Sequence, residues 1–388
     1  MSDQTDLSNY TIRLASSEQE QQYLRATFDV WSKGKSWKDY NEFFEKTLNQ
    51  GQWTEDGGTK HWVLVLRSDY DGEICSGARV YRRTALLKET SSTEIRDKYI
   101  YNVTAVVTPK SKLRRGFARH LLKLLHYELA PPEALPPFPE AEWGPPPPPL
   151  SERDRADIPP SLASALWSIV GNFYEKAGYI IQEEHLMQIK WSLRAPTSSE
   201  PPPKRSWIYS SDLPAIGAEL SEVKRAELSS QQGTSWSIDP SSKGVLSYIP
   251  TRVLRPRSQD WNEVYDHEAV GIRLPPIKAG QGEAIVLFSN ALSLLPGLLV
   301  LYVHNLEADR LPTLLEALDE ASVAAGTKEG LLWGLAEDSA LSKAWLSQPG
   351  REASIARRGD AENQLAVAWY GGHEEKGRVV DSQLWTCA

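Results

Sequence analysis

The chain has 388 residues, of which 43 are Lys or Arg and 51 are Asp or Glu, so its formal net charge is −8. A hydrophobic fraction of 40% and a charged fraction of 24% are typical of globular proteins and exclude a chain that is disordered throughout. The acidic balance disfavours a nonspecific nucleic-acid binder, because such proteins need a basic surface.

The N-terminal half alternates between strand and helix periodicity. Strands are expected at Tyr10–Ala15, His61–Arg67, Cys75–Leu87, Tyr99–Thr108, Tyr179–Ile181 and His185–Leu193. Helices are expected at Ser17–Trp31, Trp37–Asn49 and Gly116–Glu128, where apolar residues recur every three or four positions. The segment Leu162–Ala177 predicts a short strand followed by a helix, which Gly178 ends.

Prolines divide the chain. Twelve of the 26 prolines lie between Pro131 and Pro160. Because proline fixes φ and lacks an amide donor, we expect an extended, polyproline-like surface loop there, without helix. A second proline-rich break at 195–205 predicts the domain boundary. The predicted organisation is a first domain over residues 1–194 with a Pro-rich insert at 131–160, a linker at 195–205, and an α+β accessory domain at 206–388.

The second half repeats the order of the first without a sequence repeat. Strands are expected at Val245–Ile249, Glu268–Leu274, Glu283–Ser289, Leu298–Asn305, Leu331–Ala336, Gln364–Tyr370 and Val379–Trp385. Helices are expected at Ser211–Leu228, Arg310–Ala325 and Ser339–Leu346. This half is expected to wall a substrate cleft, because ligand sites often lie between domains.

The segment from Val106 to Ala118 combines a strand end, a basic turn and a helix start. A helix N-terminus presents unpaired amide donors and a partial positive charge, and Gly116 removes the Cβ that would obstruct a ligand. Five basic side chains add positive charge there: Lys110, Lys112, Arg114, Arg115 and Arg119. The pattern predicts a phosphate-binding site, and it matches neither G-x-x-x-x-G-K-[ST] nor G-x-G-x-x-G.

A second motif, Phe173-Tyr-Glu-Lys-Ala-Gly-Tyr179, lies at a helix end that leads into a strand. It matches F-Y-x-x-x-G-(F/Y/W), and Leu113-Arg-Arg-Gly-Phe-Ala118 corresponds to (Q/R)-x-x-G-x-(G/A). Through these motifs and the element order, residues 8–194 resemble the GNAT acyl-CoA N-acyltransferases. The resemblance implies an α+β fold, a mixed central sheet with helices on both faces, and a second α+β domain. Two alternatives stay open for that domain: a degenerate GNAT-like half, or another small α+β fold.

Within that superfamily the chain is most similar to the fungal lysine N6-acetyltransferases, through Val107-Thr-Pro109, Arg114–Leu122 and Leu166–Gly171. It departs from them at Leu113, where Arg or Gln is usual, and at Ile169, where we expect Asp. The resemblance implies that acetyl-CoA donates an acetyl group to the side-chain amine of free L-lysine, by direct attack and without a metal, in lysine degradation.

The resemblance also implies roles for individual residues. Acetyl-CoA would be held by Val106, Val107, Thr108, Arg114, Arg115, Gly116, Phe117, Ala118 and Arg119. Tyr174 would be the general acid that protonates the leaving thiolate. The acceptor amine, or a water beside it, would contact Tyr101, Asn102 and Thr104. The general base stays open, with Glu94 and Asp69 among the candidates.

Two cysteines and seven scattered histidines predict no metal site, and His120 and His126 are expected to be structural. The polar N-terminus and the lack of an apolar run of ~18 residues predict a cytoplasmic protein without membrane or nucleic-acid partners. Two other functions stay open. The chain could acetylate lysine in proteins or peptides, or it could be a non-catalytic CoA-binding regulator that binds partners through its Pro-rich segment.

Overall fold

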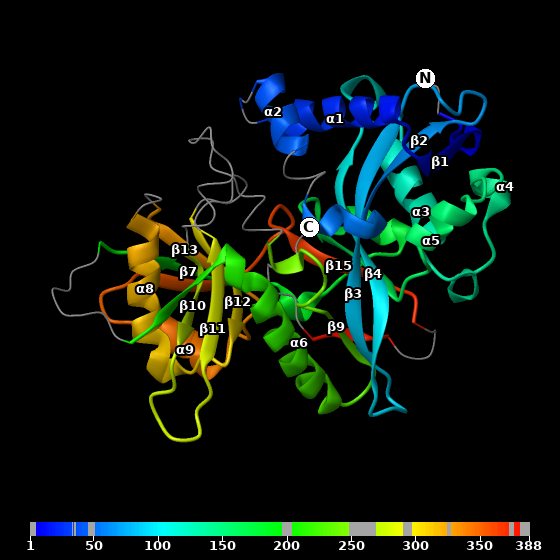
Figure 1. The fold of residues 1–388 in the computed structure, drawn as a ribbon. Coiled ribbons are helices and arrows are strands. Elements are labelled where there is room, and N and C mark those ends of the chain that lie inside the picture. The colour runs from blue at the N-terminus through cyan, green and yellow to red at the C-terminus, as the bar shows by residue number, and fades with distance from the viewer. Residues whose placement is uncertain are drawn as a thin grey trace.

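The computed structural model describes residues 5–32, 34, 36–45, 51–195, 204–247, 269–289, 297–323, 327–371 and 376–380. These residues form two mixed β-sheets with helices on their faces (Figure 1). The mixed α+β architecture is the one that the sequence predicts.

The first sheet has nine strands in the order β1-β2-β3-β4-β5-β15-β6, and β9 extends it by pairing with β3 and with β16. The strands are β1 (Tyr10–Leu14), β2 (Thr59–Leu66), β3 (Ser76–Lys88), β4 (Ile95–Val107), β5 (Ala163–Ser168), β6 (Ile180–Ile181), β9 (Ser235–Ile238), β15 (Gln364–Trp369) and β16 (Arg378–Val379). Strands β4 and β5 are parallel, as are β9 and β16. A parallel pair needs a crossover connection, and for β4 and β5 the connection contains α3 and the Pro-rich insert.

Alternate side chains place a separate core on each face of this sheet. On one face α3 (Phe117–Leu129) buries Leu121 in a cluster with Val103 of β4. On the other face lie α1 (Ser17–Trp31) and α2 (Trp37–Phe43), and buried residues of both helices share a cluster with β2 and β3 (Figure 1). The two helix layers cover opposite faces, as expected.

The Pro-rich insert is folded against the first sheet. Short helices interrupt it: η5 (Pro132–Ala134), α4 (Glu140–Trp143) and α5 (Glu152–Asp157). Lys60 of β2 pairs with Asp157 at 2.8 Å, and Tyr101 of β4 donates a hydrogen bond to the Pro159 carbonyl at 2.7 Å. The expectation of an extended insert without helix is therefore wrong. Helices α4 and α5 fall between the prolines, whereas η5 begins on Pro132, a position where the missing amide is not needed. The Ser151 side chain caps α5 by accepting from the Asp154 amide.

The second sheet has seven strands in the order β14-β7-β13-β12-β11-β10-β8. The strands are β7 (Met187–Ser192), β8 (Ser206–Tyr209), β10 (Ala269–Leu274), β11 (Ala284–Ser289), β12 (Leu298–His304), β13 (Glu329–Trp333) and β14 (Ala353–Arg357). Helices α8 (Leu311–Val323) and α9 (Ala340–Leu346) pack on one face of it. Helix α6 (Leu213–Ser229) packs in the core that the two sheets share (Figure 1).

Strands cross the predicted domain boundary in both directions. Strand β7 precedes residues 195–205 but lies in the second sheet, whereas β9, β15 and β16 follow them and lie in the first. The division into residues 1–194 and 206–388 stays a prediction, and the two sheets do not follow it. A proline-rich break shows where regular structure stops, but pairing partners far along the chain decide which sheet a strand joins.

The remaining elements of the second half agree with the sequence in most places. The predicted strand at 245–249 is an exception, because residues 245–247 are helical, and β8, β9 and β14 are not anticipated by periodicity. Some predicted segments lie outside the described residues: 196–203 of the linker, 46–49 of the second helix and 381–385 of the last strand.

The second sheet repeats one unit of the first, in which a strand, a helix and a parallel strand follow one another. Here β12 and β13 are parallel and α8 connects them. Before α8, however, the buried guanidinium of Arg310 donates to the carbonyls of Gly282 and Asn305. The turn also carries Glu307 and Asp309 and contains no glycine. This helix start is therefore filled and acidic, which is unfavourable for a phosphate.

Candidate functional site

Strands β4 and β5 separate towards their C-terminal ends. Their parallel register runs from Ile100 opposite Ala163 to Asn102 opposite Ala165. Beyond that point β4 remains paired with β3 as far as Val107, and β5 pairs with β15. Within the described part of the chain, no β4–β5 pair follows Asn102, so backbone amides and carbonyls on this side of β4 are open to a ligand.

A bulge bends β4 at this opening. The register with β3 shifts between Gly77 and Arg79, and Ala105 has a φ of 49°. Left-handed backbone is uncommon for a residue with a Cβ. The fully buried Tyr23 of α1 donates a hydrogen bond to the Ala105 carbonyl at 2.9 Å and so holds the bulge from the other side. The bulge turns the backbone at Val106 away from regular pairing.

The basic turn after β4 leads to an uncapped helix start. Arg114 has a φ of 63°, and Gly116, the N-cap of α3, has a φ of 84°. As the cap residue, Gly116 has no side chain to accept from the first amides of α3, while the Phe117 ring is buried and anchors the turn. A Cβ at Gly116 would meet only the flexible Leu7 side chain, at 3.3 Å, so the glycine is required mainly by its backbone conformation.

The five basic side chains of the turn do not all face this helix start. Lys112 pairs with Glu73 at 2.7 Å, and Lys110 lies 3.9 Å from Asp29. Of the other three, Arg115 donates to the Thr5 hydroxyl at 3.0 Å, and Arg119 lies 5.3 Å from the centre of the Phe173 ring. Arg114 is exposed. Three of the five predicted basic side chains, all arginines, therefore remain for an anion at the helix start. Arg119 of the first motif contacts Phe173 of the second.

Tyr174 lies in η6 (Gly171–Ala177), the 3-10 helix after β5. Its half-buried ring packs edge-on against Phe173 and Tyr179, with centroids 5.1 and 6.3 Å away. Burial raises the pKa of Tyr174 to about 12, so its hydroxyl carries a proton at neutral pH. The segment ends at Gly178, which has a φ of 88°, as the sequence predicts.

The three predicted acceptor-binding residues lie on two faces of β4. Tyr101 shares the α3 face with Val103, and its hydroxyl is used by the Pro159 carbonyl. Asn102 and Thr104 alternate with them and therefore lie on the opposite face, which α1 covers. A strand cannot bring Tyr101 and Asn102 to one ligand, so the structure leaves only Asn102 and Thr104 on a common face.

We expect Tyr101→Phe to lower the free energy of unfolding by about 1 kcal/mol, because it removes a buried hydrogen bond to the insert. Urea unfolding measures this change. Tyr99→Phe is the matched control, because Tyr99 is 43% exposed on the same strand, and its effect should stay below about 0.5 kcal/mol. Equal effects from both substitutions would show that the Pro159 contact does not fasten the insert.

A set of hydrogen-bonded polar side chains lies buried on the face of the sheet that carries Asn102 and Thr104. The periodicity of the sequence does not reveal it. His61 contacts Glu20 through Nδ1 at 3.0 Å and accepts from Arg79 Nε through Nε2 at 3.0 Å. Arg79 also donates to the Tyr81 hydroxyl at 3.1 Å and is 2% exposed. Burial lowers the pKa of His61. Because both ring nitrogens are engaged, His61 orients Arg79 and has no nitrogen left to take a proton.

The other candidates for a base lie away from this opening. Glu94 is exposed before β4 begins, at the end opposite the bulge, and contacts Arg96. Asp69 is exposed in the turn after β2. His126 has a structural setting, as predicted, because its Nδ1 contacts the Tyr370 hydroxyl at 3.1 Å. Within the described ranges, no group of three His, Cys, Asp or Glu side chains could hold a metal ion.

Comparison with known proteins identifies relatives by structure alone. No protein-family model and no curated sequence matches the chain. A probable N-acyltransferase of Enterococcus faecalis has a TM-score of 0.51 at 12% identity, over 93% of this chain and 72% of that one. GCN5-related N-acetyltransferases of Kribbella flavida and Anabaena variabilis have TM-scores of 0.47 and 0.46 at 11% and 13% identity, over 93% and 92% of this chain and 72% of each of theirs.

The likeness to the Enterococcus faecalis protein shows the fold alone, and it extends over both sheets. The α+β fold that the sequence resemblance implies is confirmed. The finer likeness to lysine N6-acetyltransferases receives no support from the comparisons. No helix of the described ranges is long and apolar enough to cross a membrane.

Proposed function

We propose that the protein is an N-acetyltransferase that moves the acetyl group of acetyl-CoA to a primary amine. One observation carries the proposal: the open edge of β4, with its bulge at Ala105, leads directly to the uncapped start of α3 at Gly116. An open strand edge suits the amides of a pantetheine chain, and helix-start amides suit a pyrophosphate. The two features lie in the order in which these groups follow one another in acetyl-CoA.

The chemistry then needs few groups from the chain. The neutral amine attacks the thioester carbonyl, a C–N bond forms, and the C–S bond breaks as the thiolate leaves. Backbone amides at Val106 and Val107 would stabilise the oxyanion. Tyr174 would donate a hydrogen bond to the departing sulfur. Because a thiol has a pKa of about 8.5, well below that of Tyr174, the thiolate finally takes the proton that the acylated nitrogen releases.

The acceptor that we propose is the side-chain amine of free L-lysine. The support is the similarity of Val107–Pro109, Arg114–Leu122 and Leu166–Gly171 to the fungal lysine enzymes, together with a net charge of −8, which attracts a cationic amine. Ile169 weakens the likeness where an Asp is expected, and it is 51% exposed. Proteins and peptides are the alternative acceptors.

An acceptor screen tests this function. Release of free thiol from acetyl-CoA is followed with lysine, ornithine, polyamines and a lysine-rich histone peptide. The highest kcat/KM should be found with free lysine, with the product acetylated at the side-chain amine. A higher kcat/KM for the peptide would show that proteins or peptides, and not free lysine, are the preferred acceptors. Tight binding of acetyl-CoA without turnover of any amine would exclude the enzyme and favour a non-catalytic CoA-binding regulator.

The bulge gives a further expected result. Tyr23→Phe removes the hydrogen bond to the Ala105 carbonyl, so the neighbouring amides lose their fixed direction. We expect kcat to fall about tenfold, the kinetic equivalent of one buried hydrogen bond, with little change in KM. Adding Ala105→Gly should deepen the loss by loosening the bulge. Tyr179→Phe, which removes a buried hydroxyl bonded to Ser164 away from the bulge, is the control, and an equal loss of kcat there would contradict the special role of Tyr23.

A further inference from the structure

Residues 145–149 are five consecutive prolines between α4 and α5 of the Pro-rich insert. Proline fixes φ and disfavours a helical conformation in the residue before it, so a run of prolines adopts the polyproline II helix, with about three residues per turn. The exposure of the segment has this period. Gly144 is buried, and Pro147 and Leu150 are half-buried, whereas the other four prolines are exposed. One edge of the three-sided helix therefore faces the protein, and two edges face solvent.

The two solvent-facing edges carry two prolines each. Pro145 and Pro148 are three positions apart and share one edge, and Pro146 and Pro149 share the other. Two prolines separated by two residues form the pattern P-x-x-P, which SH3, WW and EVH1 domains bind in grooves lined by aromatic side chains. Proline also has no backbone N–H that would lose its water on burial. Both exposed edges are therefore suited to such a groove.

The start of the run is held against the N-terminal segment and the end of β2. Gly144 has a φ of 75°, and a Cβ at this position would collide with the Ser8 carbonyl. Arg67, which follows β2, donates through Nε to the Ser8 carbonyl at 3.0 Å and through a terminal nitrogen to the Pro145 carbonyl. These contacts fix which edge of the run faces the protein.

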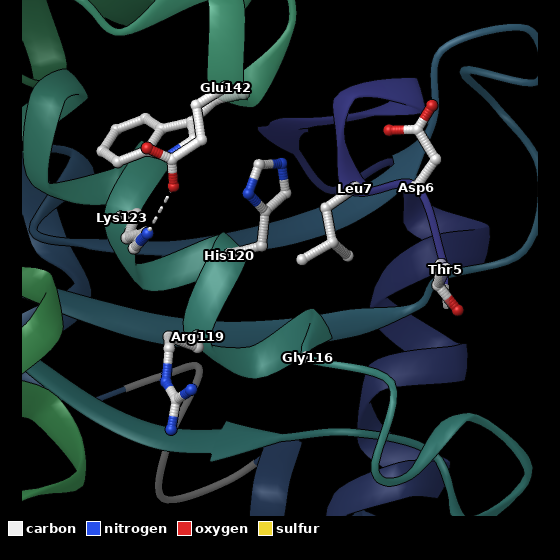
Figure 2. Close-up of a pocket in the computed structure, with 9 residues that line it drawn as sticks. Thr5, Asp6, Leu7, Gly116, Arg119, His120, Lys123 and Glu142 are labelled. Atoms are coloured by element: carbon white, nitrogen blue, oxygen red, sulfur yellow. Dashed lines mark hydrogen bonds and ion pairs between the residues drawn. The ribbon is translucent and has the colours of Figure 1, made fainter. Parts of the chain in front are cut away.

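The helices on both sides of the run are fastened to α3 and to the first sheet. Before the run, Glu142 of α4 pairs with Lys123 of α3 at 3.3 Å (Figure 2). After the run, Asp157 of α5 pairs with Lys60 of β2 at 2.8 Å, and its carbonyl accepts a hydrogen bond from Arg82 of β3 at 2.7 Å. The run is thus a short bridge between two anchored helices. A segment that is already held in its bound conformation loses little conformational entropy when a partner binds.

We propose that residues 145–149 are a docking segment for a partner protein, which binds them through an SH3-, WW- or EVH1-type groove lined by aromatic side chains. The prolines of the exposed edges would enter the groove, while Gly144, Pro147 and Leu150 remain against the protein. No residue of the run belongs to the candidate site, so binding of this partner does not depend on the proposed function.

Calorimetric titration of the full chain with purified SH3, WW and EVH1 domains tests this docking segment. We expect one of these domains to bind, and Pro148→Ala and Pro149→Ala each to weaken that binding about tenfold, because each removes the apolar surface of one proline ring from an exposed edge. Pro160→Ala is the matched control, since Pro160 is an exposed proline of the same insert outside the run, and it should change the affinity by less than about twofold. All three variants should unfold at nearly the urea concentration of the wild type, because the exchanged rings are exposed.

A synthetic peptide of residues 144–150 separates the contribution of the fold from that of the sequence. The full chain should bind the same domain at least as tightly as the peptide does, because the fold leaves two edges exposed and holds the run in place. Binding of the peptide without binding of the full chain would show that the fold covers these edges, and would overturn the proposal. Absence of binding to every domain, or equal affinity in the wild type, Pro148→Ala and Pro149→Ala, would overturn it as well.

Discussion

Gly116→Ala should raise the KM for acetyl-CoA by about ten- to a hundredfold and leave kcat nearly unchanged. Gly116 has a φ of 84°, where a residue with a Cβ costs about 1–2 kcal/mol. Relief of that strain would turn the first amides of α3 away from the position where we place the pyrophosphate. The loss would fall on binding, because these amides contact a group far from the reacting carbonyl.

Gly280→Ala is the matched control for this substitution. Gly280 has a φ of 79°, and no atom lies within 4 Å of an added Cβ, so it carries the same backbone strain away from the site. Both variants should lose similar stability in urea unfolding, while the KM for acetyl-CoA rises in Gly116→Ala alone. An unchanged KM for acetyl-CoA in Gly116→Ala would show that the start of α3 does not bind acetyl-CoA.

Tyr174→Phe should lower kcat about a hundredfold, near the upper end for loss of a hydrogen bond to a charged group, and should change the KM for acetyl-CoA little. The raised pKa of Tyr174, about 12, gives the pH dependence. The hydroxyl keeps its proton until the pH approaches that value, so the wild-type kcat should rise as the amine loses its proton and should show no fall due to Tyr174 below about pH 10.

Tyr179→Phe controls for the loss of a buried hydroxyl in the same cluster. The Tyr179 hydroxyl accepts from Ser164 at 2.9 Å, so the substitution should cost about 1 kcal/mol of stability and keep kcat within about twofold. Full turnover of Tyr174→Phe across the pH range would show that another group, or water, meets the leaving sulfur.

The parts of the site that depend on local chemistry could be predicted from the sequence. The helix start at Gly116 and the C-terminal glycine at Gly178 both follow from residues within one turn, and the structure has them where expected. The positions of Tyr101 and Asn102 on opposite faces of β4 follow from strand alternation, a signal already present in the sequence.

Other features depend on partners far along the chain. Pairing of Lys112 with Glu73 shows that a basic run does not indicate which charges remain for a ligand. Tyr23 reaches the Ala105 carbonyl across 82 positions, which no spacing rule reveals. The same holds for β7 and β15, which join sheets on the far side of the predicted boundary. The helix at Glu152–Asp157, in contrast, has a local signal. Ser151 and Asp154 form its N-terminal cap, but the high proline content of the segment led to the prediction of a loop.

Calorimetric titration of the full chain with acetyl-CoA, for the wild type and Gly116→Ala side by side, decides whether the helix start binds acetyl-CoA. We expect one site per chain in the wild type and affinity at least about tenfold weaker in Gly116→Ala, with Gly280→Ala binding as the wild type does. Absence of acetyl-CoA binding to the wild type, or equal affinity in all three proteins, would contradict this expectation.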